Sequence, residues 1–132
     1  MSPSADDLVA RARRRIDRTA PDELPSVADA GGLVVDIRPA AQRSSEGELP
    51  GALVIERNVL EWRLDPTGSH HLPEVTGFDQ PVVVVCSEGY ASSLAADSLR
   101  AMGYQKATDL IGGYRAWLRA GPSQAGDRTV RP

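Results

Sequence analysis

The residue of this 132-residue chain whose type and position most strongly suggest chemistry is its single cysteine, Cys86. It follows Val82–Val85, and this run of valines after Pro81 predicts a strand buried on both faces. Apolar or small residues then recur at helical spacing from Tyr90 to Met102. Cys86 is therefore expected in a strand-to-helix turn, where the unpaired N–H groups of the helix start favour a thiolate. The alternative is a small buried hydrophobe at a strand end.

A cysteine followed by a loop of backbone amides can hold an anionic substrate. Two reaction classes use such a site: attack on the outer sulfur of a thiosulfonate, which leaves a persulfide, and attack on phosphorus, which leaves a phosphocysteine. The phosphatase version places an arginine six positions after the cysteine to clamp the phosphoryl oxygens. Here that position is Ser92, and Glu88 in the same loop would repel a dianion. Phosphoryl transfer is therefore the less favoured of the two reactions.

Composition narrows the setting and the partners. Fifteen basic and eighteen acidic residues give a net charge of −3, which argues against nucleic acid as a partner. One cysteine cannot form an internal disulfide, and the two histidines do not complete a metal site with it, so no metal is expected. The sequence has neither a signal core nor an apolar stretch long enough to cross a bilayer. A reduced, cytoplasmic setting without membrane attachment is predicted.

Short apolar runs alternate with helical patterns along the chain. The predicted strands are 33–37, 52–55, 82–85 and 107–110, and helices are predicted to begin at Ser4 and Thr19 and to span 58–64, 90–102 and 114–120. Residues 38–51 are polar and broken by glycine and proline, so they are interpreted mainly as loop. This order predicts an α/β domain with a largely parallel sheet and helices on both faces. Ligands of such sheets bind beyond the carboxyl ends of the strands, where Cys86 is expected.

The chain divides into three predicted parts: an N-terminal helical extension over 1–18, a main domain over 19–122 and a flexible tail over 123–132. Four arginines of the extension cluster at Arg11, Arg13, Arg14 and Arg15. They could bind phosphate or RNA, but such a cluster is more often a solvated helix face, which is the interpretation adopted.

Four segments together resemble the single-domain rhodaneses, which are sulfurtransferase-like modules. Residues 35–38 resemble a strand-ending Asp-x-Arg, and residues 47–52 resemble Gly-His-Ile-Pro-Gly-Ala. Residues 86–92 resemble the active-site loop Cys-x-x-Gly-x-Arg-Ser, and residues 111–117 resemble a closing Gly-Gly-x-x-x-Trp helix. The resemblance implies a rhodanese-like fold with a small, largely parallel central sheet. It covers the chain from about Thr19 to Gly121.

The resemblance also implies a reaction and its residues. Sulfane sulfur would move from a donor such as thiosulfate, through a Cys86 persulfide, to a thiophilic acceptor: a thiol, cyanide or a protein. No separate cofactor is implied. The substrate-binding loop would consist of Ser87, Glu88, Gly89, Tyr90, Ala91 and Ser92.

This chain departs from the family pattern at two positions. Glu48 replaces a histidine and is expected to be peripheral, whereas Ala91 replaces the loop arginine that helps to hold thiosulfate in the family. The alternative function is therefore a non-catalytic module that binds a partner or senses oxidation through Cys86. Arg57 and Arg63 are candidates for supplying the missing positive charge, although exposed arginines on a short helix are the simpler interpretation.

The remaining notable residues are interpreted as structural. Asp36 and Arg38 are expected to form a polar brace beneath the loop. Trp117 is expected in the core, with its indole N–H bonded to one partner. Tyr90 is expected either to line the pocket mouth or to cap the helix start.

Overall fold

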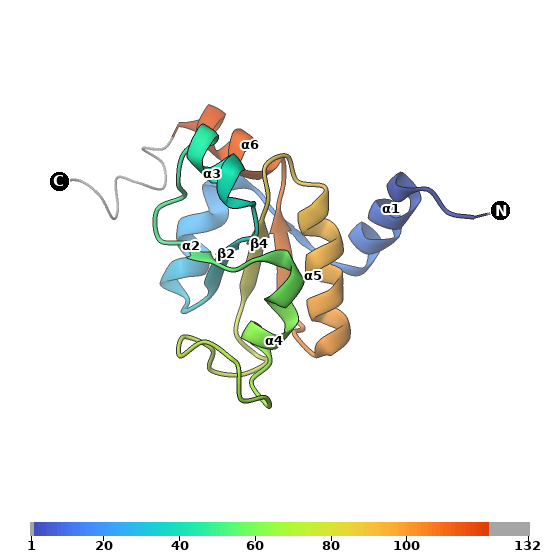
Figure 1. Cartoon of the computed structure of the whole chain (residues 1–132), viewed down its shortest axis with the longest axis vertical. Helices are drawn as coiled ribbons and strands as arrows, with labels where there is room; N and C mark the ends of the chain where they lie inside the picture. The colour runs from blue at the N-terminus through green and yellow to red at the C-terminus, as the bar shows by residue number, and fades with distance from the viewer. Residues whose placement is uncertain (1, 122–132) are drawn as a thin grey trace.

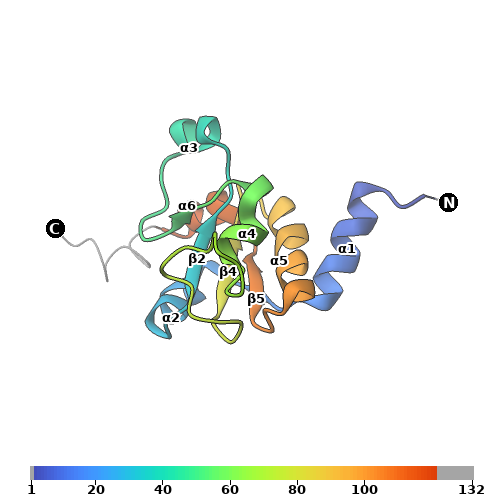
Figure 2. The same ribbon diagram turned by 60° about the horizontal axis from the view of Figure 1, so that its bottom comes forward.

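A parallel sheet organises the chain, in the order β1-β5-β4-β2-β3. The computed structural model describes residues 2–121, and every pair of neighbouring strands runs parallel. The strands are β1 Arg18–Thr19, β2 Leu33–Asp36, β3 Leu53–Val54, β4 Val82–Val85 and β5 Ala107–Leu110. Helices surround the sheet, as Figures 1 and 2 show. The predicted α/β fold with a parallel sheet is confirmed.

Helices and short 3₁₀ turns connect the strands. The helices are α1 Ala5–Arg15, α2 Leu24–Asp29, α3 Ala40–Glu46, α4 Leu60–Leu64, α5 Ala91–Met102 and α6 Gly113–Ala120, and the 3₁₀ turns are η1 Pro21–Glu23 and η2 Arg57–Val59. No helix in the described part of the chain is both long and apolar enough to span a bilayer.

Alternation along the central strand builds two separate cores. Val82 and Val84 pack in the core that α4 and α5 cover, whereas Val83 and Val85 pack in the core that α2 and α6 cover. All four valines are fully buried or nearly so. A strand covered on both faces needs apolar residues at every position, which explains the unbroken valine run.

Strand order places Cys86 where ligands bind in this class of fold. The chain passes from β2 to β3 on one side and then from β4 to β5 on the other, so β2 and β4 are neighbours at a topological switch point. Asp36 pairs in register with Val85, the residue before Cys86. The ends of both strands therefore meet at this point, beyond which open α/β sheets bind ligands.

The structure corrects three predictions about local structure, one in kind and two in detail. Residues 40–46 form α3 rather than loop; because none of its residues is buried, it has no apolar stripe to reveal it. The helix start predicted within 19–23 is the 3₁₀ turn Pro21–Glu23, which leads into α2, whereas Thr19 itself ends β1 and pairs with β5 at the sheet edge. The predicted helix 58–64 is a 3₁₀ turn followed by α4, and Val59 rather than Asn58 occupies its N-cap.

The N-terminal helix α1 begins as predicted and packs against α5 (Figure 1). The Ser4 side chain accepts from the Asp7 N–H and the Asp7 carboxylate accepts from the Ser4 N–H, so a capping box starts the helix. The apolar face of α1 supplies Val9 and Ala12, both buried. The predicted tail, 123–132, lies outside the described residues.

Candidate active site

Cys86 lies in the turn between β4 and α5. The backbone N–H groups of Gly89 and Ser92 donate to its Sγ atom, at 3.1 and 3.3 Å. The residue is 8% exposed, so the sulfur is largely shielded from water. Ser92 is in the first turn of α5, where N–H groups have no helical partner and carry the positive end of the helix dipole. The two N–H donors and the start of α5 therefore complement an anion at this position.

The start of α6 holds the cysteine loop from the other side. The N–H groups of Tyr114 and Arg115 donate to the carbonyl oxygens of Cys86 and Ser87, at 2.8 and 3.1 Å. Gly113 has a φ of +67°, and a Cβ atom on it would lie 2.5 Å from the Cys86 carbonyl oxygen. Gly89, with a φ of +90°, is restricted in the same way, because its Cβ would lie 2.8 Å from the Gly112 nitrogen. The two turns touch through glycine backbone, and side chains would separate them.

A fully buried carboxylate, Asp109 on β5, anchors the start of α5. It accepts from the hydroxyl groups of Ser92 and Ser93, at 2.7 and 2.8 Å. Arg18 of β1 pairs with the same carboxylate through two nitrogens, at 2.8 and 3.1 Å. The sequence analysis missed Asp109; the available signal was one acidic residue inside an otherwise buried strand.

Arg38 is the centre of a second polar brace. Its fully buried guanidinium pairs with Asp36 at 2.7 Å and with Glu46 of α3 at 3.1 Å, and it also donates to the Gly47 carbonyl at 2.9 Å. The guanidinium carbon lies 4.0 Å from the centre of the Tyr114 ring. These contacts tie the end of β2 to α3 and α6. They match the expected structural brace, which extends to the loop through Glu46.

Glu46 connects this brace to the cysteine loop. Its carboxylate accepts from the Ser87 hydroxyl at 2.6 Å and pairs with Arg115 at 3.0 Å. The hydrogen bond from Ser87 lowers the pKa of Glu46; burial opposes this, and Arg115 and Arg38 lower the pKa further. Arg115 also pairs with exposed Glu88 at 3.1 Å. Sequence reasoning missed Glu46, which lies in none of the four matching segments, and Arg115, which occupies a variable position of the Gly-Gly-x-x-x-Trp segment.

The predicted loop residues divide into buried and exposed positions. Tyr90 is 57% exposed and occupies the N-cap position of α5 without a capping side-chain hydrogen bond. Ala91 is exposed and brings no charge to the loop, whereas Ser87 is buried. Glu48 is exposed, with its carboxylate 3.4 Å from Arg43.

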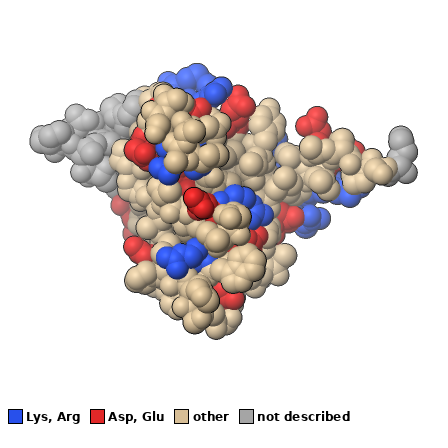
Figure 3. All heavy atoms as spheres, viewed as in Figure 1, with Lys and Arg blue, Asp and Glu red and all other residues tan. Residues whose placement is uncertain are grey.

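The two arginines proposed as sources of positive charge have partners near their own helix. Arg57 pairs with Glu61 at 3.0 Å, and Arg63 donates to the His70 carbonyl at 2.6 Å. Their hydrogen bonds therefore hold Arg57 to Glu61 and Arg63 to His70, rather than to the cysteine loop. Figure 3 shows the positive and negative side chains of this face interspersed rather than gathered into a patch of one sign.

Trp117 lies in the core as expected, but the partner predicted for its indole N–H is not among the described residues. The side chain is 4% exposed, and no acceptor within residues 2–121 takes its N–H. Among the same residues, no group of three or more His, Cys, Asp and Glu is placed to hold a metal ion.

Comparison with known proteins identifies the family. The sequence profile described as the Rhodanese-like domain matches residues 20–120. This match spans most of the chain, and the chain belongs to the rhodanese-like domain family.

Two curated relatives carry sulfurtransferase in their names. The adenylyltransferase and sulfurtransferase UBA4 of Candida albicans is 31% identical over 102 residues, which are 76% of this chain and 23% of that protein. The thiosulfate sulfurtransferase GlpE of Haemophilus influenzae is 35% identical over 63 residues, which are 42% of this chain and 60% of that protein. The chain thus spans less than two thirds of either relative.

Solved structures have the same fold. RPA3614 of Rhodopseudomonas palustris, described as a protein of unknown function and possible tyrosine phosphatase, superposes with a TM-score of 0.80 and 25% identity, covering 92% of this chain and 93% of that one. The human single-domain sulfurtransferase TSTD1 superposes with a TM-score of 0.65 and 27% identity, covering 77% of this chain and 95% of that one.

Proposed function

We propose that this protein is a sulfurtransferase that carries sulfane sulfur as a persulfide on Cys86. One observation carries the proposal: in a rhodanese-like domain, Cys86 Sγ lies at the carboxyl end of the central strand and accepts two backbone N–H groups. A thiolate held in this way is a nucleophile, and the same amides suit the anionic persulfide that it becomes.

The reaction has two balanced steps. The Cys86 thiolate attacks the outer sulfur of thiosulfate; the new Cys86 S–S bond forms as the bond between the two donor sulfurs breaks, and sulfite leaves with its electron pair. A thiophilic acceptor such as cyanide or a thiolate then attacks the outer sulfur of the persulfide. That bond breaks, the thiolate of Cys86 returns and thiocyanate or an acceptor persulfide leaves. The donor product departs before the acceptor reacts, so ping-pong kinetics are expected.

The loop of residues 87–92 would bind the donor through its backbone. It contains neither lysine nor arginine, and the side chain at the arginine position of the family is Ala91. A hydrogen bond to a charged group contributes about 1.5–3 kcal/mol. A sulfur donor held only by backbone amides should therefore bind roughly ten-fold to a hundred-fold more weakly than one also held by an arginine. Dependence on Cys86 with modest thiosulfate activity is the expected result. The relative UBA4, which joins a sulfurtransferase to an adenylyltransferase, makes a protein acceptor a natural candidate.

Phosphoryl transfer is the second candidate, since the R. palustris structure is described as a possible tyrosine phosphatase. The residues of the loop argue against it. Glu88 supplies a negative charge, and no arginine within residues 86–92 is available to clamp phosphoryl oxygens.

The test is intact-mass measurement after exposure to thiosulfate and to a small organic persulfide, with Cys86→Ser as the control. The parent protein should gain the mass of one sulfur atom, lose it to cyanide or a dithiol, and form thiocyanate when cyanide is the acceptor; Cys86→Ser should do none of these. If parent and Cys86→Ser are equally inert with both donors, the binding or redox-sensing role replaces the enzyme. Hydrolysis of an aryl phosphate that depends on Cys86 would favour the phosphatase instead.

A further inference from the structure

An arginine from outside the family domain reaches the cysteine loop. Arg13 lies on α1, whereas the family profile begins at residue 20. Its guanidinium donates to the Gly89 carbonyl at 2.6 Å and to the Ser93 hydroxyl at 3.0 Å, and its carbon lies 5.3 Å from the centre of the Tyr90 ring. The interpretation of this arginine as part of a solvated face was wrong.

Arg13 holds Gly89, the one residue of the loop without a side chain to restrict its backbone rotation. Gly89 has a positive φ of +90°, and a glycine backbone is free to leave such a conformation. Its N–H donates to Cys86 Sγ, while its carbonyl accepts from Arg13 and, at 3.1 Å, from Arg18. Anchoring both polar groups of one glycine fixes the rotation on each side of its Cα atom. The orientation of the Gly89 N–H toward the sulfur therefore depends on what holds the carbonyl.

Arg13 differs from the other arginines near the loop in the groups that it contacts. Arg18 is paired with Asp109, and Arg115 is shared between Glu46 and Glu88. The hydrogen bonds recorded for Arg13 go instead to neutral acceptors, namely the Gly89 carbonyl and the Ser93 hydroxyl. Neither of these contacts pairs its positive charge with a carboxylate.

We infer that Arg13 is a positioning residue of the Cys86 site, so that α1 contributes a side chain to the candidate active site. It holds the Gly89 carbonyl so that the N–H of the same residue faces the Cys86 sulfur. The inference rests on the proposed role of Cys86 as a nucleophile and adds to it a residue that the loop motif does not contain.

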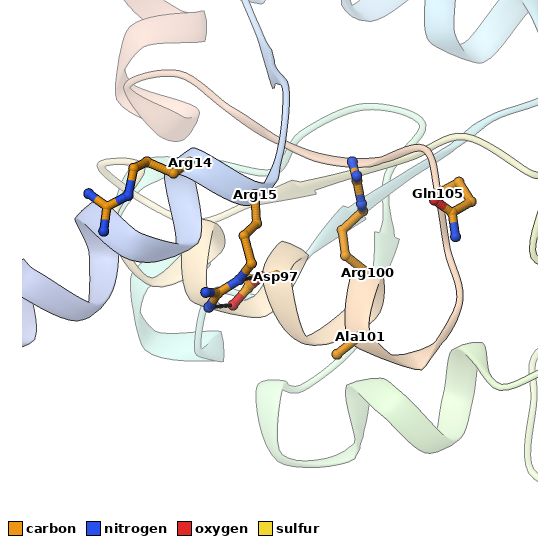
Figure 4. Close-up of a pocket in the computed structure, with 6 residues that line it drawn as sticks. All are labelled: Arg14, Arg15, Asp97, Arg100, Ala101 and Gln105. Atoms are coloured by element: carbon orange, nitrogen blue, oxygen red, sulfur yellow. Dashed lines mark hydrogen bonds and ion pairs between the residues drawn. The ribbon is translucent and has the colours of Figure 1, made fainter.

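A neighbouring arginine provides a matched control. Arg14 lines a groove between α1 and α5 together with Arg15, Asp97 and Arg100. In Figure 4, Arg15 reaches Asp97, whereas Arg14 extends away from that pair. Arg14 is exposed and has the same helical setting as Arg13 without its contacts to the loop. Methionine and arginine have similar helix propensities, so both positions can be changed to methionine without weakening α1 itself.

The experiment measures the alkylation rate of Cys86 by iodoacetamide from acidic to alkaline pH, in the full chain. Arg13→Met should slow alkylation at neutral pH by about three-fold to ten-fold, as the loss of a partly exposed charged hydrogen bond would, and should shift the profile to higher pH. Arg14→Met should match the parent protein. Arg13→Lys, which keeps the charge but has one ammonium group for two acceptors, should fall between.

Each result decides the inference. If Arg13→Met and the parent share one pH profile, the inference is overturned. If Arg14→Met changes the profile as much as Arg13→Met, a general charge effect replaces positioning. Should Arg13→Met fail to fold by circular dichroism, Arg13→Lys decides in its place: a shifted profile supports the inference and an unchanged one refutes it. Alkylation needs no sulfur donor, so a protein that behaves as expected here but forms no persulfide contradicts only the proposed function.

Discussion

The cysteine loop and α6 can contact each other closely because residue 113 is glycine and has no side chain. Gly113→Ala tests how much this close contact contributes to stability. A Cβ atom there would lie 2.5 Å from the Cys86 carbonyl oxygen and 2.6 Å from both the carbonyl carbon and oxygen of Ser87. All three atoms belong to the backbone, so no side chain can rotate away. The α6 helix or the loop must move.

The magnitude follows from two separate costs. A residue other than glycine at a φ of +67° costs about 1–2 kcal/mol. Overpacking against fixed backbone adds about 1–3 kcal/mol, and movement of α6 weakens the hydrogen bonds that Tyr114 and Arg115 donate to the loop. Gly113→Ala should therefore lower the free energy of unfolding by about 2–5 kcal/mol, a large share of the total for a domain of this size.

Gly31→Ala separates the two costs. Gly31 has a φ of +84°, but a Cβ atom there would meet nothing within 4 Å. Only the backbone cost should appear, about 1–2 kcal/mol. Urea unfolding gives both values, and alkylation of Cys86 in the folded variants should change for Gly113→Ala alone. The reasoning is refuted if Gly113→Ala is no less stable than Gly31→Ala.

Three further predictions concern the polar side chains of Tyr104, Glu46 and Trp117. Burial raises the pKa of Tyr104 to about 12, so the stability that its neutral hydroxyl contributes is complete below the ordinary pKa near 10 and is lost as pH rises toward 12. Tyr104→Phe should therefore flatten the loss of stability at alkaline pH. The variant also leaves the Leu64 carbonyl unpaired, which should cost about 1–2 kcal/mol in urea unfolding at neutral pH. The pKa of Glu46 is lowered, chiefly by the hydrogen bond from the Ser87 hydroxyl. The stability that its carboxylate contributes is therefore present above the ordinary pKa of 4.5 and is lost as pH falls through the lowered pKa. Glu46→Gln should therefore reduce the acid sensitivity of the thermal midpoint, and an unchanged acid limb would contradict this. Trp117→Phe should cost only about 1–2 kcal/mol of lost apolar burial, because no residue of the described range 2–121 accepts its indole N–H; a loss above about 3 kcal/mol in urea would reveal an unrecognised partner.

Local sequence patterns predicted the structure correctly where one physical requirement selects a particular type of residue. Val82–Val85 could only be a strand covered on both faces, and the structure buries all four residues. The N-cap of α1 at Ser4 was equally readable, because a hydroxyl two or three residues ahead of unpaired N–H groups satisfies them.

Patterns failed where stability comes from partners distant in sequence. α3 buries none of its residues, and β1 is only two residues long, so neither has a periodicity to detect. β1 exists because β5 offers an edge to pair with. The indole of Trp117 could not be assigned a partner, or the lack of one, without knowing which acceptors surround it.

By itself, the sequence determined the class of fold, the rhodanese-like family and the place of Cys86 at the end of a buried strand, because strand burial, helix starts and turns are short-range properties. Only the tertiary structure decided what surrounds that sulfur. Asp109 lies 23 positions after Cys86 and Arg13 lies 73 before it, yet both are anchored to the same loop and helix start. Strand order and helix packing bring them there, and no local pattern encodes the distance between residues so far apart.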